Sequence, residues 1–260
     1  MSNARTTIFD SAPGGRALAG TGAPAWSRLR TQLHVWLHGA LPQLCALCAA
    51  PAGPRLLCAA CADALPRIGK VCPGCALPTP EGRACAACRE RPPPWRHAVA
   101  AFAYAYPLDR LLHALKYRGA TAYAPLFAGA LVERLLHDAP TPPDALVALP
   151  LSPARQRDRG YNQAIEIARP LARTLGLPLV TGLRRTRDTP PLAGLPWRER
   201  QRLVNHAFAA DPCVAGRAVA LVDDVLTTGA TLRAATRALH AAGAASVDVW
   251  VVARTLPPSS

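Results

Sequence analysis

One run of the chain combines side chains that could bind a phosphorylated sugar. Four apolar residues, Val219 to Val222, predict a buried strand, and Asp223 and Asp224 follow it directly. A Thr-Thr-Gly-Ala-Thr turn at 227–231 then opens into a helical pattern. Such a turn presents free backbone N–H groups and the positive end of a helix dipole, which suits phosphate. The two carboxylates would repel a phosphate, so we expect them to bind sugar hydroxyls or Mg²⁺ beside it.

Two other interpretations of this run compete with phosphate binding. An apolar strand ending in Asp-Asp also occurs as the second nucleotide-binding motif of P-loop ATPases. That interpretation needs a Gly-x-x-x-x-Gly-Lys-Ser/Thr loop, which the chain lacks; its lysines are Lys70 and Lys116. The other interpretation is a generic strand-to-helix turn that is capped by Asp or Thr. The three threonine hydroxyls and the glycine of the turn favour phosphate over both.

Eight of the nine cysteines form four Cys-x-x-Cys pairs. Two residues between thiolates let one turn present both sulfur atoms to a tetrahedral ion, so two turns complete a Cys₄ zinc site. Each cysteine of the first two pairs recurs 27 positions later, which indicates an internal duplication. The pattern predicts two structural zinc ions, with the ligands Cys45, Cys48, Cys58, Cys61, Cys72, Cys75, Cys85 and Cys88.

The spacing alone does not decide which pairs share a metal. The first pair can join the second or the third, and the repeat favours the tandem arrangement. A thioredoxin-like redox motif would instead be a single pair near a βαβ unit. Residues 45–88 contain few large apolar side chains, so this segment should depend on metal to fold. We expect its core to be separate from that of the rest of the chain.

Length and composition predict a globular protein of one or two domains, because half of the 260 residues are apolar. No run approaches the roughly 18 consecutive apolar residues of a membrane-spanning helix. The N-terminus lacks the apolar region of a secretory signal. We therefore expect a cytoplasmic protein without membrane insertion. Residues 1–41 are predicted to be a disordered N-terminus with a short helix at 26–41.

The formal net charge of +14 invites an interpretation as a nucleic-acid-binding protein, but the excess is local. Residues 155–202 carry 11 arginines against 4 acidic residues. The planar fork of donors on arginine suits the oxygens of a diphosphate. A solvated basic face or a nucleic-acid groove is the alternative, and the two roles can coexist.

Beyond three prolines at 92–94, strand and helix patterns alternate. Strands are predicted at 99–106, 145–149, 177–180, 217–222 and 246–253, and helices at 108–117, 123–137, 162–175 and 230–242. This alternation predicts an α/β fold, a mostly parallel sheet with helices on both faces. Ligands bind at the carboxyl ends of such strands. The turn at 227–231 and the predicted loop at 150–160 both follow strands, so we expect them to face one crevice.

Several longer motifs accompany these elements. They are Leu-Lys-Tyr-Arg-Gly at 115–119, Leu-Pro-Leu-Ser…Arg-x-x-x-Arg-Gly-Tyr-Asn-Gln-Ala at 149–164, Arg-x-x-x-Thr at 185–189 and Arg202…Asn205…Ala207-Phe208. Together with the cysteine pairs and the acid-threonine run, they make the chain resemble the ComF (competence protein F) family over residues 42–254. Proteins of that family are cytoplasmic and bacterial, with a double zinc ribbon before a type I phosphoribosyltransferase domain.

The resemblance implies two modules and a ligand. A double zinc ribbon would occupy residues 42–96, and a phosphoribosyltransferase domain would occupy residues 97–260. The ligand would be phosphoribosyl pyrophosphate (PRPP). The 5′-phosphate would lie on Thr227, Thr228, Gly229, Ala230 and Thr231.

The resemblance also implies roles for the acidic and basic residues. Asp223 and Asp224 would hold the ribose hydroxyls, and Mg²⁺ would bridge the ribose and the diphosphate. The Mg²⁺ would be assisted by Arg155, Arg159 and the PRPP-binding backbone of Gly160. The catalytic residues would be Asp223, Asp224, Arg155 and Arg159. A mobile lid would contain Arg185, Arg187 and Thr189. One departure from the family is Leu192, which stands where a Gln is common.

Two functions from different classes follow from this resemblance. The first is an enzyme that transfers 5-phosphoribose to an acceptor, which no residue identifies, and releases diphosphate. The second is a non-catalytic PRPP-sensing adaptor in natural transformation and DNA uptake, which binds single-stranded DNA or a competence helicase. A homodimer is an open alternative for the assembly.

Overall fold

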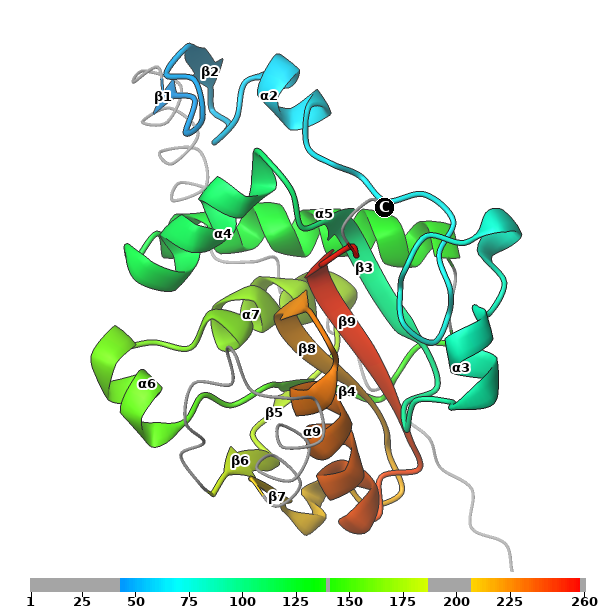
Figure 1. Ribbon diagram of the computed structural model, residues 1–260. Coiled ribbons are helices and arrows are strands. Elements are labelled where there is room, and N and C mark those ends of the chain that lie inside the picture. The colour runs from blue at the N-terminus through cyan, green and yellow to red at the C-terminus, as the bar shows by residue number, and fades with distance from the viewer. Residues whose placement is uncertain (1–42, 139–140, 187–206, 258–260) are drawn as a thin grey trace, which may run out of the picture.

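The centre of the computed structural model is a five-stranded sheet (Figure 1). The structure describes residues 43–138, 141–186 and 207–257. Its strands follow the spatial order β3-β9-β8-β4-β5, and every neighbouring pair is parallel. They are β3 (Ala98–Ala103), β4 (Ala145–Ala148), β5 (Leu179–Val180), β8 (Ala218–Leu226) and β9 (Ser246–Arg254). The predicted α/β fold with a parallel sheet is confirmed.

Helices cover both faces of this sheet, because alternate strand residues point to opposite sides. Ala220 and Val222 of β8 belong to one hydrophobic cluster, whereas Val219 and Leu221 belong to another. The first cluster packs against α4 (Leu108–Tyr117), α5 (Ala124–Asp138) and α7 (Gln163–Leu175). The second packs against α9 (Ala230–Ala241) and the antiparallel pair of β6 (Leu183–Arg185) and β7 (Phe208–Ala210). Two short 3-10 helices, η2 (Thr121–Tyr123) and η3 (Pro212–Val214), complete this part.

Helix α4 illustrates how the sequence pattern places an element. Leu108, Leu111, Leu112 and Leu115 recur at helical spacing, and all four are buried. They fix the helix against the sheet, so its last turn ends beside the carboxyl end of β8. The predicted helix at 108–117 agrees with α4 in both bounds.

Strand β8 extends further than the sequence pattern predicted. Asp223 and Asp224 lie inside the strand, and the pairing with β9 continues to Leu226. Ladder hydrogen bonds come from the backbone, so polar side chains do not end a strand whose neighbour runs on beside it. The acidic pair is therefore held by a rigid strand rather than by a turn.

A short helix, α6 (Pro153–Arg159), replaces the loop that was predicted at 150–160. Ser152 accepts a hydrogen bond from the backbone N–H of Arg155 at the helix start, and Pro153 occupies the first turn. Gly160 ends the helix at φ 73°, a left-handed conformation that glycine adopts without strain. The loop prediction was wrong, because Ser152, Pro153 and Gly160 are capping residues that begin and end a short helix.

The cysteine-rich part contains β1 (Gln43–Leu44), β2 (Pro51–Gly53), α2 (Ala59–Asp63), η1 (Pro80–Gly82) and α3 (Ala86–Glu90). It does not have a core of its own. Leu57 and Leu65 are buried in the cluster under α4 and α5, and Ala76 and Trp95 belong to the cluster under α9. The expectation of a separate core is therefore wrong, because the few apolar residues here bury themselves against the larger sheet. The predicted helix at 26–41 lies outside the described residues.

Within the described ranges, no helix is both long enough and apolar enough to cross a membrane.

Candidate functional site

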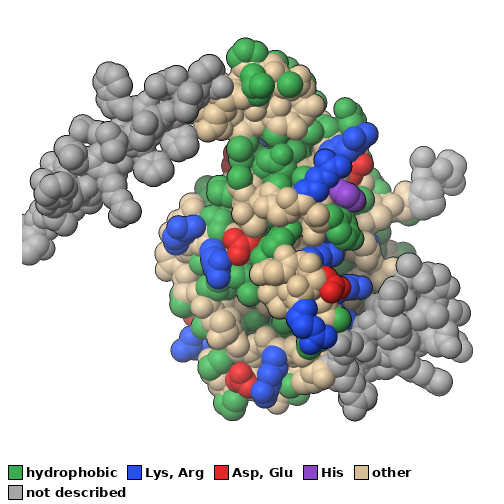
Figure 2. All heavy atoms as spheres, turned by 90° about the vertical axis from the view of Figure 1, so that its left-hand side faces the viewer, with side chains coloured by type: hydrophobic (Ala, Val, Ile, Leu, Met, Phe, Trp, Pro, Cys, Tyr) green, Lys and Arg blue, Asp and Glu red, His purple; other side chains and the backbone are tan. Residues whose placement is uncertain are grey.

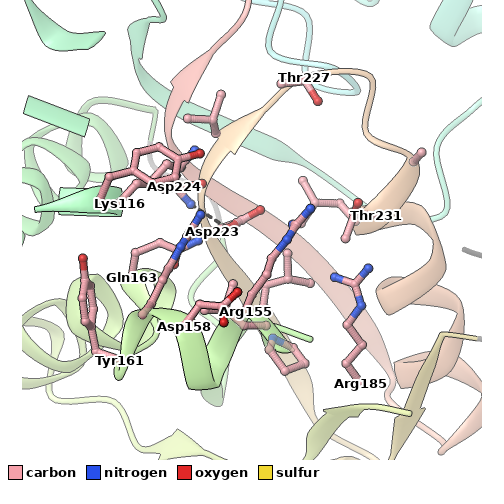
Figure 3. A pocket seen from close by; sticks show the side chains of 18 of the residues that line it. Lys116, Arg155, Asp158, Tyr161, Gln163, Arg185, Asp223, Asp224, Thr227 and Thr231 are labelled. Atoms are coloured by element: carbon pink, nitrogen blue, oxygen red, sulfur yellow. Dashed lines mark hydrogen bonds and ion pairs between the residues drawn. The ribbon is translucent and has the colours of Figure 1, made fainter. Parts of the chain in front are cut away.

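A cavity of about 820 Å³ lies beside the carboxyl ends of β4 and β8. Figure 3 shows side chains from several elements around this space, including Lys116, Arg155, Asp223 and Thr231. The site residues that the sequence predicted and that line the cavity are Arg155, Arg159, Arg185, Asp223, Asp224, Thr227, Thr228, Gly229, Ala230 and Thr231. The turn at 227–231 and the segment at 150–160, most of which is α6, thus border one cavity, as predicted.

The turn between β8 and α9 forms one wall of the cavity. Gly229 stands at the N-cap of α9 with φ 76°, and α9 begins at Ala230. The first turn of an α-helix has backbone N–H groups without intrahelical partners, and the helix dipole adds partial positive charge there. A Cβ at position 229 would lie 3.3 Å from side-chain atoms of Leu226 and Trp95. The helix start therefore suits an anion, and glycine at 229 fits the left-handed conformation and the close packing of the turn on Leu226 and Trp95.

Two carboxylates from β8 border the same cavity. Asp223 and Asp224 are both buried, at 9% and 4% exposed. Burial raises the pKa of Asp223 well above its usual range, and the charge of Asp224 raises it further. The Asp223 side chain also accepts a hydrogen bond from the backbone N–H of Asp224 at 2.8 Å. The strand therefore places two buried carboxyl groups in the cavity, directly before the turn at 227–231, and the raised pKa favours the protonated form of Asp223.

Lys116 contributes a positive charge that the sequence analysis did not assign to the site. Its Nζ atom lies 2.9 Å from Oδ2 of Asp224, as an ion pair. Burial lowers the pKa of Lys116, but the charge of Asp224, the hydrogen bond to it and the charge of Asp223 together outweigh this effect and raise that pKa overall. Lys116 stays charged in the cavity as a result. A signal was available, because Lys116 is one of only two lysines among 30 basic residues and lies in the 115–119 motif.

Helix α6 and the start of α7 form the opposite wall. Arg159 donates a hydrogen bond to Oε1 of Gln163 at 2.9 Å, and its guanidinium lies 4.9 Å from the ring centroid of Tyr117. Tyr161 donates its hydroxyl hydrogen to the carbonyl of Leu115, which ties this wall to α4. Arg159 is thus pre-positioned by contacts with neighbouring side chains. Further lining residues that the sequence analysis did not assign are Tyr117, Asp158, Tyr161 and Gln163.

Asn162 fixes the direction of this wall. It caps α7, because its Oδ1 accepts from the backbone N–H of Ala164 at 2.8 Å. Its Nδ2 donates to the carbonyl of Leu149 at 3.0 Å, at the end of β4. In the sequence, Gly160 lies between Arg159 and Tyr161, which both line the cavity.

The predicted lid is described only in part. Arg185 ends β6, lines the cavity, and has its guanidinium 5.4 Å from the ring centroid of Phe208. Arg187, Thr189 and Leu192 lie outside the described residues.

The eight paired cysteines form two groups, Cys45, Cys48, Cys58 and Cys61, and Cys72, Cys75, Cys85 and Cys88. The sulfur atoms within each group lie within 4.8 Å of one another. The Sγ atoms of Cys48 and Cys58 are 3.7 Å apart, as are those of Cys75 and Cys85. Four thiolates around a tetrahedral zinc have their sulfur atoms about 3.8 Å apart, given Zn–S bonds of about 2.3 Å. Both groups therefore fit zinc, in the tandem pairing that the repeat favoured.

Backbone donors support the second cysteine group. The N–H groups of Gly74 and Cys85 donate to Sγ of Cys72, at 3.4 and 3.3 Å. Burial raises the pKa of the Cys72 thiol, but these donors, together with the backbone and side chain of Cys75, outweigh it and bring the pKa to about 7. Gly74 is required here, because a Cβ would lie 2.9 Å from Sγ of Cys88. The knuckle thus favours a thiolate, the form of cysteine that binds metal.

Comparison with known proteins agrees with this arrangement. The chain matches the family models of a phosphoribosyl transferase domain over residues 162–256 and a double zinc ribbon domain over residues 36–89. The DNA utilization protein YhgH of Escherichia coli (strain K12) is 37% identical over 172 residues, which are 64% of this chain and 76% of that protein. Competence protein F of Haemophilus influenzae is 31% identical over 171 residues, 62% of this chain and 74% of that protein.

Solved structures also align with the chain. One is the glutamine PRPP amidotransferase of B. subtilis in complex with ADP and GMP, at 22% identity and a TM-score of 0.33. The alignment covers 49% of this chain and 26% of that one. At that TM-score it supports no conclusion about function.

The chain is a phosphoribosyltransferase-type protein with two zinc-ribbon-like Cys₄ sites. This class is defined by the parallel sheet, by the two cysteine groups and by the two family models that the chain matches. More narrowly, the chain belongs to the ComF family, that of competence protein F and the DNA utilization proteins.

Proposed function

We propose that this protein binds PRPP with Mg²⁺ and transfers its 5-phosphoribosyl group to an acceptor, with release of diphosphate. The observation that carries this proposal is the composition of one cavity. An anion-binding turn, a pair of carboxylates and two arginines of α6 all line it. PRPP carries a phosphate, ribose hydroxyls and a diphosphate, so each wall has a matching part of the ligand.

The 5′-phosphate is assigned to the turn from Thr227 to Thr231. The free N–H groups of the first turn of α9 would donate to its oxygens, together with the threonine hydroxyls. Asp223 and Asp224 would accept hydrogen bonds from the ribose hydroxyls. Their position on β8, just before the turn, matches the order of ribose and 5′-phosphate in the ligand.

The diphosphate is assigned to Arg155, Arg159 and the backbone of Gly160. Negative charge develops on the diphosphate as its bond to C1′ breaks, and arginine donors stabilise such charge strongly in a partly enclosed site. Arg185 lies at the edge of the same cavity, and we propose that it belongs to a lid with Arg187 and Thr189. Closure of this lid would exclude water from C1′.

The side chains of the cavity also suit a magnesium ion. Mg²⁺ prefers carboxylate, water and phosphate oxygens, and Asp158, Asp223 and Asp224 supply carboxylates at the cavity wall. When bound with PRPP, the ion would neutralise part of the diphosphate charge. In the transfer, the acceptor forms a bond to C1′ and gives up a proton. The C1′–O bond to diphosphate breaks, and diphosphate leaves with the electron pair.

A second candidate function is a non-catalytic, PRPP-sensing adaptor that binds single-stranded DNA or a helicase partner. Two relatives carry names that refer to DNA utilization and competence. Tyr104, Tyr106 and Tyr117 have exposed side chains, and exposed aromatic rings can stack on unpaired bases. Figure 2 shows Lys and Arg side chains scattered over the described part of one face rather than gathered into one stripe.

Calorimetry with PRPP and Mg²⁺, followed by an assay for released diphosphate, tests these proposals. Binding with release over a panel of acceptors supports the transferase, and binding without release supports the adaptor. The double variant Asp223→Asn and Asp224→Asn should weaken PRPP binding, because charge-assisted hydrogen bonds of about 1.5–3 kcal/mol each are lost. Inorganic phosphate should bind the double variant at least as well, since repulsion is relieved.

The control for this experiment is a variant with two carboxyl-to-amide changes outside the cavity. Glu133→Gln with Glu166→Gln removes two negative charges from exposed ion pairs with Arg67 and Arg169. This control should bind PRPP as the parent does. If the double Asn variant also keeps the parent affinity, the carboxylates do not hold the ligand and the proposed function fails.

A further inference from the structure

One arginine connects the second cysteine group to the anion-binding turn. Arg254, the last residue of β9, donates from Nε to the carbonyl of Cys75 at 2.7 Å. Its Nη1 donates to the carbonyls of Leu226 at 2.8 Å and Thr227 at 2.5 Å, where β8 enters the turn, and to Thr255 at 2.8 Å. A single rigid guanidinium therefore spans from a cysteine knuckle to the start of the phosphate-binding turn.

Trp95 makes a second connection between the same two places. Its Nε1 donates to the carbonyl of Gly74, inside the Cys72–Cys75 knuckle, at 2.7 Å, and the side chain is buried. The guanidinium of Arg233, in the first turn of α9, lies 5.1 Å from the ring centroid. The edge of the ring also approaches the position that a Cβ at Gly229 would take, to 3.3 Å. Trp95 thus packs between the knuckle and the N-terminus of α9.

Both connections end on carbonyl groups of the Cys72–Cys75 knuckle, so their positions depend on how that knuckle is held. A metal ion bound by Cys72, Cys75, Cys85 and Cys88 would hold Gly74 and Cys75 in place. A zinc ion with four thiolates carries a net charge of about −2, which the nearby guanidiniums of Arg233 and Arg254 would offset. Burial lowers the pKa of both arginines, and the negative charge of Cys75 and Cys88 opposes that effect.

The first cysteine group occupies a different place. Cys45 is buried in the cluster that contains α4 and α5, and Cys58 and Cys61 pack against the same cluster. In Figure 1, β1, β2 and α2 lie at the top of the view, beyond α4, whereas α3, which carries Cys88, lies at the right-hand side, away from them. The two groups are alike in sequence but differ in what they touch.

We propose that metal in the second cysteine group positions the phosphate-binding turn through Arg254 and Trp95, so that PRPP affinity depends on this metal and not on the metal of the first group. The proposal rests on the proposed binding of PRPP. It makes Arg254 and Trp95 positioning residues, which act on the turn without touching the ligand. The second ribbon then serves as a support for the site.

Equivalent substitutions in the two repeats provide the test. Cys88→Ser removes a ligand of the second group, and Cys61→Ser removes the corresponding ligand of the first. Each variant should lose about one zinc per chain by elemental analysis. Calorimetry with PRPP and Mg²⁺ should show affinity at least about tenfold weaker for Cys88→Ser, the factor that corresponds to one lost charge-assisted hydrogen bond. Cys61→Ser should remain within about twofold of the parent.

Two tryptophan substitutions, one of them a control, test the proposal even if Cys88→Ser fails to fold. Trp95→Phe retains the ring and removes the N–H that bonds to Gly74, without a change in any cysteine. Trp250→Phe is the matched control, because Trp250 is also buried and its Nε1 makes no hydrogen bond within the described ranges. Both variants should keep two zinc ions. Trp95→Phe should bind PRPP several-fold more weakly, whereas Trp250→Phe should not.

Hydrogen exchange provides a readout that does not need the ligand. The backbone amides of residues 226–231 should exchange faster in Cys88→Ser and Trp95→Phe than in the parent, and at the parent rate in Cys61→Ser and Trp250→Phe. The proposal is overturned if Cys88→Ser and Trp95→Phe keep parent affinity, or if Cys61→Ser and Trp250→Phe weaken binding as much. If the parent itself does not bind PRPP, the proposed function fails, while the exchange data still decide whether the second group holds the turn.

Discussion

Lys116 and Asp224 form an ion pair at 2.9 Å inside the candidate ligand cavity, with side chains only 22% and 5% exposed. The lysine comes from the last turn of α4, and the aspartate comes from β8. Breaking one side of such a pair leaves a buried charge without compensation, which costs far more than the pair itself contributes. Single and double substitutions of the two residues should therefore differ clearly in their effect on stability.

We expect Lys116→Met to lower the free energy of unfolding by about 3 kcal/mol, because Asp224 loses its counter-charge. The double variant with Asp224→Asn should recover much of this loss, since no unpaired charge remains. Urea unfolding of the parent, the two single variants and the double variant measures the coupling. Strictly additive effects would mean that the two side chains do not interact in solution.

A pH-dependent stability change is expected for Asp223→Asn. Burial and Asp224 raise the pKa of Asp223, so the folded protein holds this proton more tightly than the unfolded chain does. The folded state is therefore favoured at low pH and loses stability as the pH rises toward the raised pKa. Asparagine removes that loss and can still accept the hydrogen bond from the Asp224 N–H.

Thermal unfolding at about pH 5 and about pH 8 checks this expectation. Asp223→Asn should melt a few degrees higher than the parent at the higher pH, with a smaller difference at the lower pH. Asp109→Asn, on the exposed start of α4, is the control and should show no such trend. A variant that is less stable than the parent at both pH values would contradict the prediction.

Gly229→Val should abolish binding of PRPP, ribose 5-phosphate and inorganic phosphate alike. The residue has φ 76°, and even a Cβ would press on Leu226 and Trp95 at 3.3 Å. A β-branched side chain would enlarge this clash and displace the N–H groups of the turn. Gly176→Ala is a control for backbone strain, because Gly176 has φ 67° and open space around it. Phosphate affinity that survives in Gly229→Val would remove the turn from the site.

Elemental analysis of the purified protein should find about two zinc ions per chain, one for each cysteine group. Acidification should release them, because protons compete with zinc for the thiolates. One zinc or none at neutral pH would contradict the presence of two Cys₄ sites.

PRPP should compete with single-stranded DNA for the protein if Arg155, Arg159 and Arg185 serve the diphosphate. Fluorescence anisotropy with a labelled oligonucleotide measures this competition, and the DNA affinity should fall steeply with salt. DNA binding that saturating PRPP does not change would place the nucleic acid outside the cavity.

Local sequence patterns determined much of this protein. Leucines at helical spacing predicted α4, and the Thr-Gly turn after an apolar run predicted the junction of β8 and α9. Cysteine spacing predicted two Cys₄ groups. These inferences succeed because helix periodicity, turn conformation and metal-ligand spacing are set by residues close together in the chain.

Other features depend on contacts between distant residues, which only the tertiary structure decided. The length of β8 through its acidic pair depends on β9, and the approach of Lys116 to Asp224 depends on how α4 packs against the sheet. The contacts of Arg254 and Trp95 with the second cysteine group are likewise set by the packing of a small ribbon that has no core of its own. Apolar side chains of such a segment must be buried elsewhere, and here they are buried beside the candidate site.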